Sequence, residues 1–435
     1  MSNAAVFEVK GWCPGALRPM QSGDGLIVRV RPQAGTLRLA TLVALTEAAA
    51  RFGNAQIDLT RRANLQIRGV SETSLSALHE AIGELGLLDE SPEGEAVRNL
   101  MIGPLAGGDP TEVLDVRAIA VELARLLASD PAIWTLPTKF GFILDGGGTL
   151  TLASERADIR LVAMRAGADV VIAIGIDTEG GVDWLGSVSP DAAAAAALAT
   201  ARAFLGVTSR ESRQRMRDLP TQGLASLRAT MKSRLDPMIL FPERPNAALS
   251  RRIGLLDLGA GRFAVGMAAP FGRVETDQCL QFAAAISELG VKEIRLSPWR
   301  ALYAEAATQK NSEAILDAAV EAGFIADPTD PLLRIEACPG APACASTSLD
   351  TRGDGRRLAD ILARAHFTGT AHVSGCAKGC AKSDAADLVL VGAEGRYGIV
   401  HHGTAQDRPL RTSSFAELAA DPSPILKRPE SPSHD

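Results

Sequence analysis

The chain has 435 residues, of which 46% are hydrophobic, and a formal net charge of −6. This length predicts two to four domains with buried cores, and the mildly acidic balance argues against a nucleic-acid-binding protein. The sequence contains no run of eighteen apolar residues and its N-terminus lacks the regions of a signal peptide. We therefore expect a soluble, cytoplasmic protein without a membrane partner.

An internal duplication is predicted from the order of the elements. GLIVRVRP from Gly25 predicts a strand, residues 36–53 an amphipathic helix, residues 55–70 two strands and residues 71–88 a second helix. The same β-α-β-β-α order returns from residue 261 to 324. Residues 57–67 align with residues 294–304, which favours two copies of one unit.

Each copy leads into a segment that mixes strands with helices, so the fold class is predicted to be α+β. The remaining two segments are polar. Residues 206–245 are expected to form a helical linker, and the Pro- and Ser-rich tail, residues 406–435, is expected to be disordered.

Four of the six cysteines stand in two short stretches. Cys338 and Cys344 are separated by five residues, and Cys376 and Cys380 by three. Zinc sites and thioredoxin-like sites favour C-x-x-C pairs, whereas four thiols in two Gly- and Pro-containing loops suit an iron–sulfur cluster. Zinc or unliganded thiols remain the alternatives. The lone Cys13 and Cys279 are expected to be ordinary small residues.

These features resemble the nitrite and sulfite reductase haemoprotein family. Residues 59–70 (LTRRANLQIRGV), 98–107 (RNLMIGPLAG) and 136–142 (LPTKFGF) are similar to its motifs, and the resemblance runs from Trp12 to His402. It implies duplicated ferredoxin-like half-domains combined with two cluster-type α+β domains in a pseudo-two-fold arrangement. The implied bounds are 12–92 and 250–328 for the half-domains, and 95–205 and 331–405 for the α+β domains. The four paired cysteines would hold one [4Fe–4S] cluster, in the second α+β domain.

The resemblance also implies a site for a carboxylate-rich macrocycle. Its residues would be Arg61, Arg62, Asn64, Gln66, Arg98, Lys139, Trp299 and Arg300. Permanently charged guanidinium groups suit carboxylates because they form bidentate pairs. The alternative for the arginines is that they pair with acids of the protein itself.

Gly141 departs from the sulfite reductase pattern, in which a second lysine stands two residues after the equivalent of Lys139. The chain is more similar to a shorter branch of the family, the precorrin-3B synthases of aerobic cobalamin biosynthesis. This implies that the macrocycle, precorrin-3A, is a substrate, which O2 hydroxylates at C20 with formation of a γ-lactone, and that no sirohaem is bound.

The same resemblance implies a mononuclear non-haem iron and a separate electron-donor reductase. Histidine spacing identifies no iron ligands; His372, His401 and His402 are candidates. GAGRFA, residues 259–264, precedes a predicted strand rather than a helix, so we do not expect a nicotinamide site there. The alternatives are a sirohaem-dependent nitrite or sulfite reductase and a non-catalytic tetrapyrrole or cluster carrier.

Overall fold

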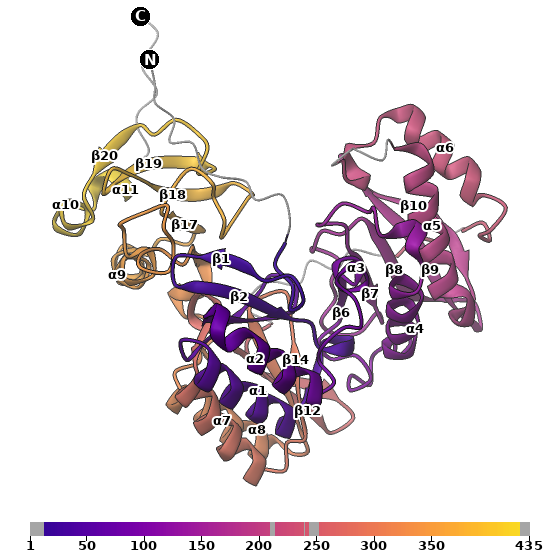
Figure 1. The fold of residues 1–435 in the computed structure, drawn as a ribbon, viewed down its shortest axis with the longest axis horizontal. Helices are drawn as coiled ribbons and strands as arrows, with labels where there is room; N and C mark the ends of the chain where they lie inside the picture. The colour runs from indigo at the N-terminus through magenta and orange to yellow at the C-terminus, as the bar shows by residue number, and fades with distance from the viewer. Residues whose placement is uncertain (1–12, 209–213, 239, 243–251, 427–435) are drawn as a thin grey trace, which may run out of the picture. The chain divides into compact units, whose positions relative to one another are not determined.

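The computed structural model describes residues 13–208, 214–238, 240–242 and 252–426 (Figure 1). Contacts divide the chain into two units, a larger one built mainly from residues 27–328 and a smaller one built mainly from residues 329–435. The described residues contain four five-stranded sheets and helices, which confirms the α+β class. None of the described helices has the length and apolar composition that crossing a membrane requires.

The first ferredoxin-like half follows the predicted order. Its elements are β1 (Met20–Ser22), β2 (Gly25–Val30), β3 (Thr36–Arg38), α1 (Leu39–Phe52), β4 (Gln56–Leu59), β5 (Leu65–Val70) and α2 (Glu72–Glu84). Helix α2 begins where Ser71 accepts a hydrogen bond from the Ser74 N–H, as expected for a serine N-cap. Helix α1 buries one face, which includes Leu42 and Leu45, and this gives the half its core.

The second half repeats this order and confirms the duplication. Its elements are β11 (Gly254–Gly259), β12 (Arg262–Ala268), β13 (Arg273–Glu275), α7 (Thr276–Glu288), β14 (Glu293–Leu296), β15 (Ala301–Ala306) and α8 (Gln309–Glu321). Helices α1, α7 and α8 lie side by side in Figure 1, and the contacts of α7 with α1 and α8 agree.

Each half gives one strand to the other. The two sheets have the orders β1-β2-β5-β4-β13 and β11-β12-β15-β14-β3. Strand β13 pairs with β4 through Val274 and Ile57, and β3 pairs with β14 through Leu37 and Ile294. These four side chains are buried. The exchange is reciprocal, so the halves form a pseudo-two-fold pair whose sheets cannot be completed separately.

The first α+β domain has the sheet order β10-β9-β8-β7-β6, in which β6, β7 and β8 are parallel. Its elements are α3 (Pro92–Val97), β6 (Leu100–Ile102), α4 (Arg117–Ala128), β7 (Phe142–Asp145), β8 (Ile159–Ala166), β9 (Asp169–Thr178), β10 (Gly181–Val188) and α5 (Ala193–Val207). The apolar faces of α4 and α5 share one core with β7, β8 and β9.

The second α+β domain repeats that topology with the order β16-β17-β18-β19-β20, in which β16, β17 and β18 are parallel. Its elements are β16 (Ile335–Ala337), α9 (Thr351–Arg364), β17 (Ala371–Ser374), β18 (Ala386–Ala393), β19 (Arg396–Gly403) and β20 (Arg411–Ser413). The duplication therefore extends to these domains. Counted from the strand ends, Gly103 and Gly147 of the first domain stand where Cys338 and Cys376 stand in the second.

The predicted linker is part of the first α+β domain. Helix α6 (Thr221–Met231) packs on α5, and Met216, Leu219 and Leu227 are buried in the core of that domain. Asp236 extends the contact by pairing with Ser187 at the end of β10. The prediction of a linker over residues 206–245 is wrong for the described part of this segment, because its apolar side chains pack into the core of the domain.

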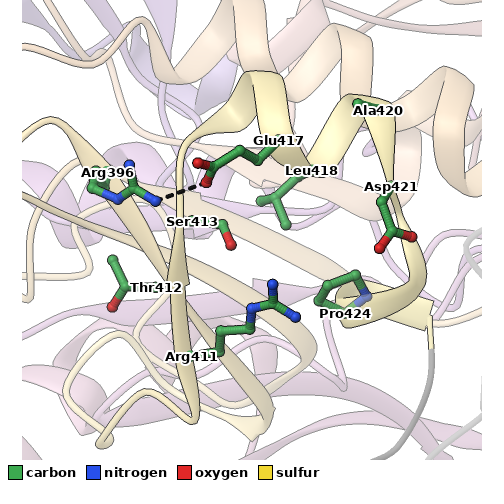
Figure 2. A pocket seen from close by; sticks show the side chains of 9 residues that line it. All are labelled: Arg396, Arg411, Thr412, Ser413, Glu417, Leu418, Ala420, Asp421 and Pro424. Carbon is green, nitrogen blue, oxygen red and sulfur yellow. Dashed lines mark hydrogen bonds and ion pairs between the residues drawn. The ribbon is translucent and has the colours of Figure 1, made fainter.

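The predicted disordered tail is folded as far as residue 426. Strand β20 pairs with β19, α10 (Phe415–Ala420) begins with a capping box between Ser414 and Glu417, and α11 (Ser423–Leu426) follows. Figure 2 shows the cavity beside these elements, with a volume of about 470 Å³, where Arg396 and Glu417 form a 2.7 Å ion pair. Residues 427–435 of the predicted tail lie outside the described residues.

The raised pKa of the Glu112 carboxyl group predicts that the free energy of unfolding depends on pH. Burial raises the pKa of its carboxyl group from 4.5 to about 7, and the negative charges of Asp115, Asp109 and Asp145 add to this effect. Because the carboxylate is disfavoured in the folded state, the protein loses stability as the pH rises from about 4.5 through about 7.

We expect Glu112→Gln to raise the free energy of unfolding by about 1 kcal/mol at pH 8, since solvent screening reduces the effect at this half-buried site. At pH 4 no such gain is expected. Thermal melts of both proteins at the two pH values measure this, with the exposed Glu179→Gln as the control. An equal change at both pH values would contradict the assignment.

Candidate functional site

Four arginines of the larger unit form what we call the arginine cluster: Arg29, Arg31, Arg62 and Arg215. Arg29 and Arg31 lie two residues apart at the end of β2 and therefore point to the same face. Burial lowers the pKa of Arg29 to about 10, and the positive charges of Arg31 and Arg62 contribute. Burial also lowers the pKa of Arg62, with contributions from Arg215 and Arg31. Arg29, Arg31 and Arg62 thus lie within electrostatic range of one another, and Arg215 lies within range of Arg62.

Glu95 neutralises Arg31 and fixes the N-terminal segment beside it. Its carboxylate is buried, forms an ion pair with Arg31, and accepts hydrogen bonds from the N–H groups of Ala16 (2.6 Å) and Leu17 (3.0 Å). A Cβ atom at Gly15 would lie 2.4 Å from Glu95 Oε2, so only glycine fits there. This arrangement holds the chain that follows Cys13 against strand β2.

The arginine cluster has more positive than negative charge. Its carboxylate partners are Glu95, for Arg31, and Asp158, for Arg215. Arg29 and Arg62 form no ion pair with a carboxylate in the part of the chain that the structure describes. Arg29 lies within hydrogen-bonding reach of the Cys13 thiol, and its buried Nε atom has no hydrogen-bond partner there. Both side chains are half-buried, so two partly desolvated guanidinium groups have no carboxylate partner among the described residues.

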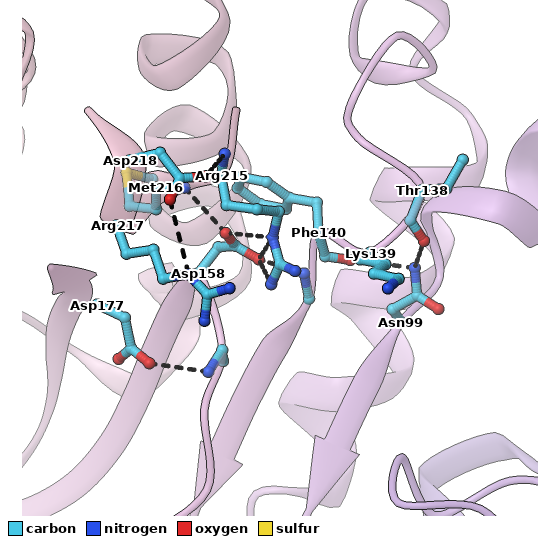
Figure 3. Close-up of polar contacts among 12 residues, drawn as sticks. Asn99, Thr138, Lys139, Phe140, Asp158, Asp177, Arg215, Met216, Arg217 and Asp218 are labelled. Carbon is cyan, nitrogen blue, oxygen red and sulfur yellow. Dashed lines mark hydrogen bonds and ion pairs between the residues drawn. The ribbon is translucent and has the colours of Figure 1, made fainter. Parts of the chain in front are cut away.

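The segment that contains Lys139 is held from two sides (Figure 3). Asn99 Nδ2 donates to the carbonyl oxygen of Phe140 at 3.0 Å. Asp158 accepts hydrogen bonds from the N–H groups of Gly141 (2.8 Å) and Met216 (3.0 Å) and from the guanidinium of Arg215 (2.8 Å to Nε). The Lys139 side chain itself is exposed. Asp158 thus joins this segment to the arginine cluster.

Of the residues predicted for macrocycle binding, Arg62 and Lys139 come together. Arg62 Nη2 donates to the Lys139 carbonyl oxygen at 2.8 Å. Arg61 precedes Arg62 and is exposed. Asn64 is buried, and its N–H donates to Thr60 Oγ1 in the β4–β5 turn, so its backbone shapes the turn that presents Arg62. Gln66 is half-buried on β5, opposite Asp58 in the strand register.

Arg98 is occupied by the protein. Its Nε and Nη2 atoms donate to both carboxylate oxygens of Asp89 at 2.7 Å, and Nη1 donates to the carbonyl oxygen of Arg31 at 3.1 Å. Arg98 therefore pairs with an acid of the protein itself, which was the alternative to macrocycle binding. Its role in the structure is to position the end of β2, and thereby Arg31.

Trp299 and Arg300, also predicted for macrocycle binding, contact groups of the protein itself. The indole Nε1 of Trp299 donates to Glu155 at 2.7 Å, and the Arg252 guanidinium lies 4.0 Å from the ring centroid. The other contacts of the ring include Ile143 of β7. The aliphatic part of half-buried Arg300 packs beside the Cα of Gly272. Both residues are half-buried, and we leave them out of the candidate site because the Trp299 indole N–H is already bonded to Glu155.

Sequence analysis missed Arg29, Arg31 and Arg215. The alternation V-R-V-R in β2 was a usable indication, because residues two apart in a strand share a face. No comparable sequence pattern indicated that Arg215 belongs to the cluster. It lies 57 residues from its partner Asp158, in the segment predicted to be a linker.

The paired cysteines occupy one edge of the sheet in the smaller unit. Cys338 directly follows β16, and Cys376 follows β17 by one residue. These strands are adjacent and parallel, so both loops leave the sheet at the same edge. The Gly375 N–H donates to Cys338 Sγ at 3.2 Å, and the Cys344 N–H donates to the carbonyl oxygen of Gly340 at 2.7 Å.

The four thiols lie within electrostatic range of one another. Burial raises the pKa of Cys380 to about 11, and charge on Cys338, Cys376 and Cys344 raises it further. Burial likewise raises the pKa of Cys376, with contributions from Cys344 and Cys338. Four thiolates gathered in this way are stable only around a positive centre, so this donor set fits an iron–sulfur cluster.

No ligand set for a mononuclear iron emerges. Among the described residues, no group of three or more His, Cys, Asp or Glu side chains, the four paired cysteines included, is arranged to hold a single metal ion. His401 Nε2 contacts the Pro424 carbonyl oxygen at 3.1 Å, and His402 Nδ1 lies 3.4 Å from Asp387. His372 is buried in β17.

Removing Asp158 should destabilise the larger unit. Asp158→Ala leaves Arg215 and two backbone N–H groups without their acceptor, and we expect a loss of about 3–5 kcal/mol in the free energy of unfolding. Chemical denaturation measures the loss. Asp183→Ala, which removes the partner of the exposed Arg228, is the control and should cost less than about 1 kcal/mol. Equal losses would show that Asp158 is not a structural centre.

Comparison with known proteins identifies the family. The nitrite/sulfite reductase ferredoxin-like half domain matches residues 18–85. A Sinorhizobium protein named precorrin-3B synthase is 35% identical over 417 residues, which are 92% of this chain and 84% of the relative. A ferredoxin sulfite reductase of Mycolicibacterium paratuberculosis is 24% identical over 388 residues, 84% of this chain and 69% of the relative.

The solved structure of the Mycobacterium tuberculosis NirA protein has the same fold. It aligns with a TM-score of 0.76 at 21% sequence identity, over 91% of this chain and 79% of that chain. The fold match and the half-domain match agree with the duplicated architecture, and the identity to the Sinorhizobium protein is shared along almost the whole chain. The chain belongs to the precorrin-3B synthase family, within the larger group of nitrite and sulfite reductase-like proteins.

Proposed function

We propose that this protein is a precorrin-3B synthase. It hydroxylates precorrin-3A at C20 with O2 and reducing equivalents, and forms a γ-lactone, in cobalamin biosynthesis. One oxygen atom of O2 enters the ring and the other leaves as water. The observation that carries the proposal is the arginine cluster, in a chain that is 35% identical to a precorrin-3B synthase over 92% of its length.

The cluster suits a substrate with many carboxylates. Arg29 and Arg62 are partly desolvated cations without a carboxylate partner in the described chain, and Lys139 lies beside Arg62. Each charge-assisted hydrogen bond to a substrate carboxylate would contribute about 1.5–3 kcal/mol. Glu95, Asp158 and Arg98 keep the cationic groups in place, so that binding requires little reordering of the site.

We further propose that Cys338, Cys344, Cys376 and Cys380 hold one [4Fe–4S] cluster. Bound there, the cluster would pass single electrons from a donor reductase to the reaction. The chain's own contribution is to supply four thiolates from two loops and to donate the Gly375 N–H to Cys338 Sγ. A mononuclear iron for oxygen activation and a cytoplasmic location complete the proposal.

A sirohaem-dependent nitrite or sulfite reductase is the second candidate, because a ferredoxin sulfite reductase is 24% identical to the chain over 388 aligned residues. Gly141 argues against it. Reduction of a small oxyanion needs concentrated positive charge, and at this segment Lys139 is followed two residues later by glycine rather than by a second cation.

The cluster assignment predicts a clear division among the six cysteines. Serine at position 338, 344, 376 or 380 should remove most of the iron and sulfide from anaerobically purified protein, because one thiolate ligand is lost. Cys279→Ser and Cys13→Ser should retain both elements. Iron and sulfide analysis with electron paramagnetic resonance measures this, and equal losses in all six variants would refute the assignment.

The proposed reaction is tested with isotope-labelled oxygen. Protein, precorrin-3A, a reductant and ¹⁸O2 should give a hydroxylactone in which mass spectrometry detects one atom of ¹⁸O from O2. The purified protein should lack a sirohaem absorption band. Sulfide formation from sulfite at an enzymatic rate, with no change in the mass of the precorrin, would establish the reductase instead.

A further inference from the structure

Gly141 lacks a side chain for reasons of space and not of backbone conformation. It is absent from the glycines with left-handed φ angles, so its backbone conformation is open to other residues. A Cβ atom placed there would lie 3.3 Å from the Asn99 carbonyl oxygen and 3.7 Å from Arg62 Nη1. A methyl group would just fit between these atoms, and a longer side chain that extends toward Arg62 would displace its guanidinium.

Asn99 cannot easily move. Its carbonyl oxygen accepts the Phe142 N–H at 2.9 Å where β6 and β7 begin to pair, and its side chain donates to the carbonyl oxygens of Ala96 and Phe140. The backbone of Gly141 is also fixed, because its N–H donates to Asp158 at 2.8 Å. The movable neighbour is therefore the guanidinium of Arg62.

We propose that Gly141 is a specificity-determining residue. By leaving the space beside Asn99 empty, it lets the Arg62 guanidinium lie against the Lys139 carbonyl oxygen, where Arg62 and Lys139 together meet a carboxylate of a tetrapyrrole. A large side chain at position 141 would take the place of this guanidinium. The inference rests on the proposed function, since it assumes a polycarboxylate ligand.

The test uses uroporphyrin III, a stable tetrapyrrole with eight carboxylates, whose binding to the full-length protein is followed by fluorescence. Gly141→Ala should weaken binding by less than about threefold, and Gly141→Leu by at least about tenfold, the equivalent of one charge-assisted contact. Gly141→Lys should also weaken binding although it adds a positive charge. Gly180→Leu is the matched control, because nothing lies within 4 Å of a Cβ atom at that glycine.

The double variant shows whether Gly141 acts through Arg62. In an Arg62→Ala background, Gly141→Leu should cause little further loss of affinity, since the guanidinium that it displaces is already gone. If Gly141→Leu alone does not fold, Arg62→Ala should restore the thermal transition by freeing the same space. A full additional loss in the double variant, or no rescue of folding, would overturn the proposal.

The outcomes also separate this inference from the proposed function. If the unaltered protein does not bind the tetrapyrrole, the proposed ligand class fails. If it binds, and Gly141→Leu and Gly141→Lys bind as tightly, only the role of Gly141 fails. Tighter binding by Gly141→Lys would show that charge rather than space matters at this position.

Discussion

The compensation of buried arginine charge by two carboxylates is the constraint on which the candidate site depends. Several guanidinium groups near one another are unstable away from water unless anions accompany them. Glu95 and Asp158 supply that charge, and each also accepts backbone N–H groups from a segment distant in sequence. The same two groups therefore neutralise part of the cluster and fasten the segments that form it. What they leave uncompensated is the positive charge of Arg29 and Arg62.

The two ferredoxin-like halves share a backbone but differ in the side chains of one turn. The turn that presents Arg62 in the first ferredoxin-like half presents Trp299 at the equivalent position in the second, and the residues that follow them, Ala63 and Arg300, share a left-handed backbone. Both side chains are half-buried, but Arg62 contacts the Lys139 carbonyl oxygen, whereas Trp299 contacts Glu155 and Arg252.

The two α+β domains diverged in the same manner. Glycines at positions 103 and 147 follow the strands of one, and cysteines at positions 338 and 376 follow the equivalent strands of the other. Topology is shared, because the parallel strands bring both loops to one sheet edge. The side chains placed on that edge decide whether it can hold a cluster.

The sequence by itself predicted the main helices and strands of the two ferredoxin-like halves, the duplication, and two loops with two cysteines each. These depend on periodicity, on turn residues and on the order of strands, all of which are local properties of the chain. The family resemblance also indicated Arg62 and Lys139. It could not show that Arg98 is bound to Asp89, because that requires the actual geometry of the loop between α2 and α3.

Only the tertiary structure decided which charges remain available. Arg215 reaches Asp158 across 57 residues, β3 and β13 exchange between the halves, and residues 214–236 enter a core that their polar composition does not suggest. Such contacts leave no periodic pattern, because each depends on the packing of segments far apart in the chain. The sequence determined which cations the chain carries, and the fold determined which of them are left for a ligand.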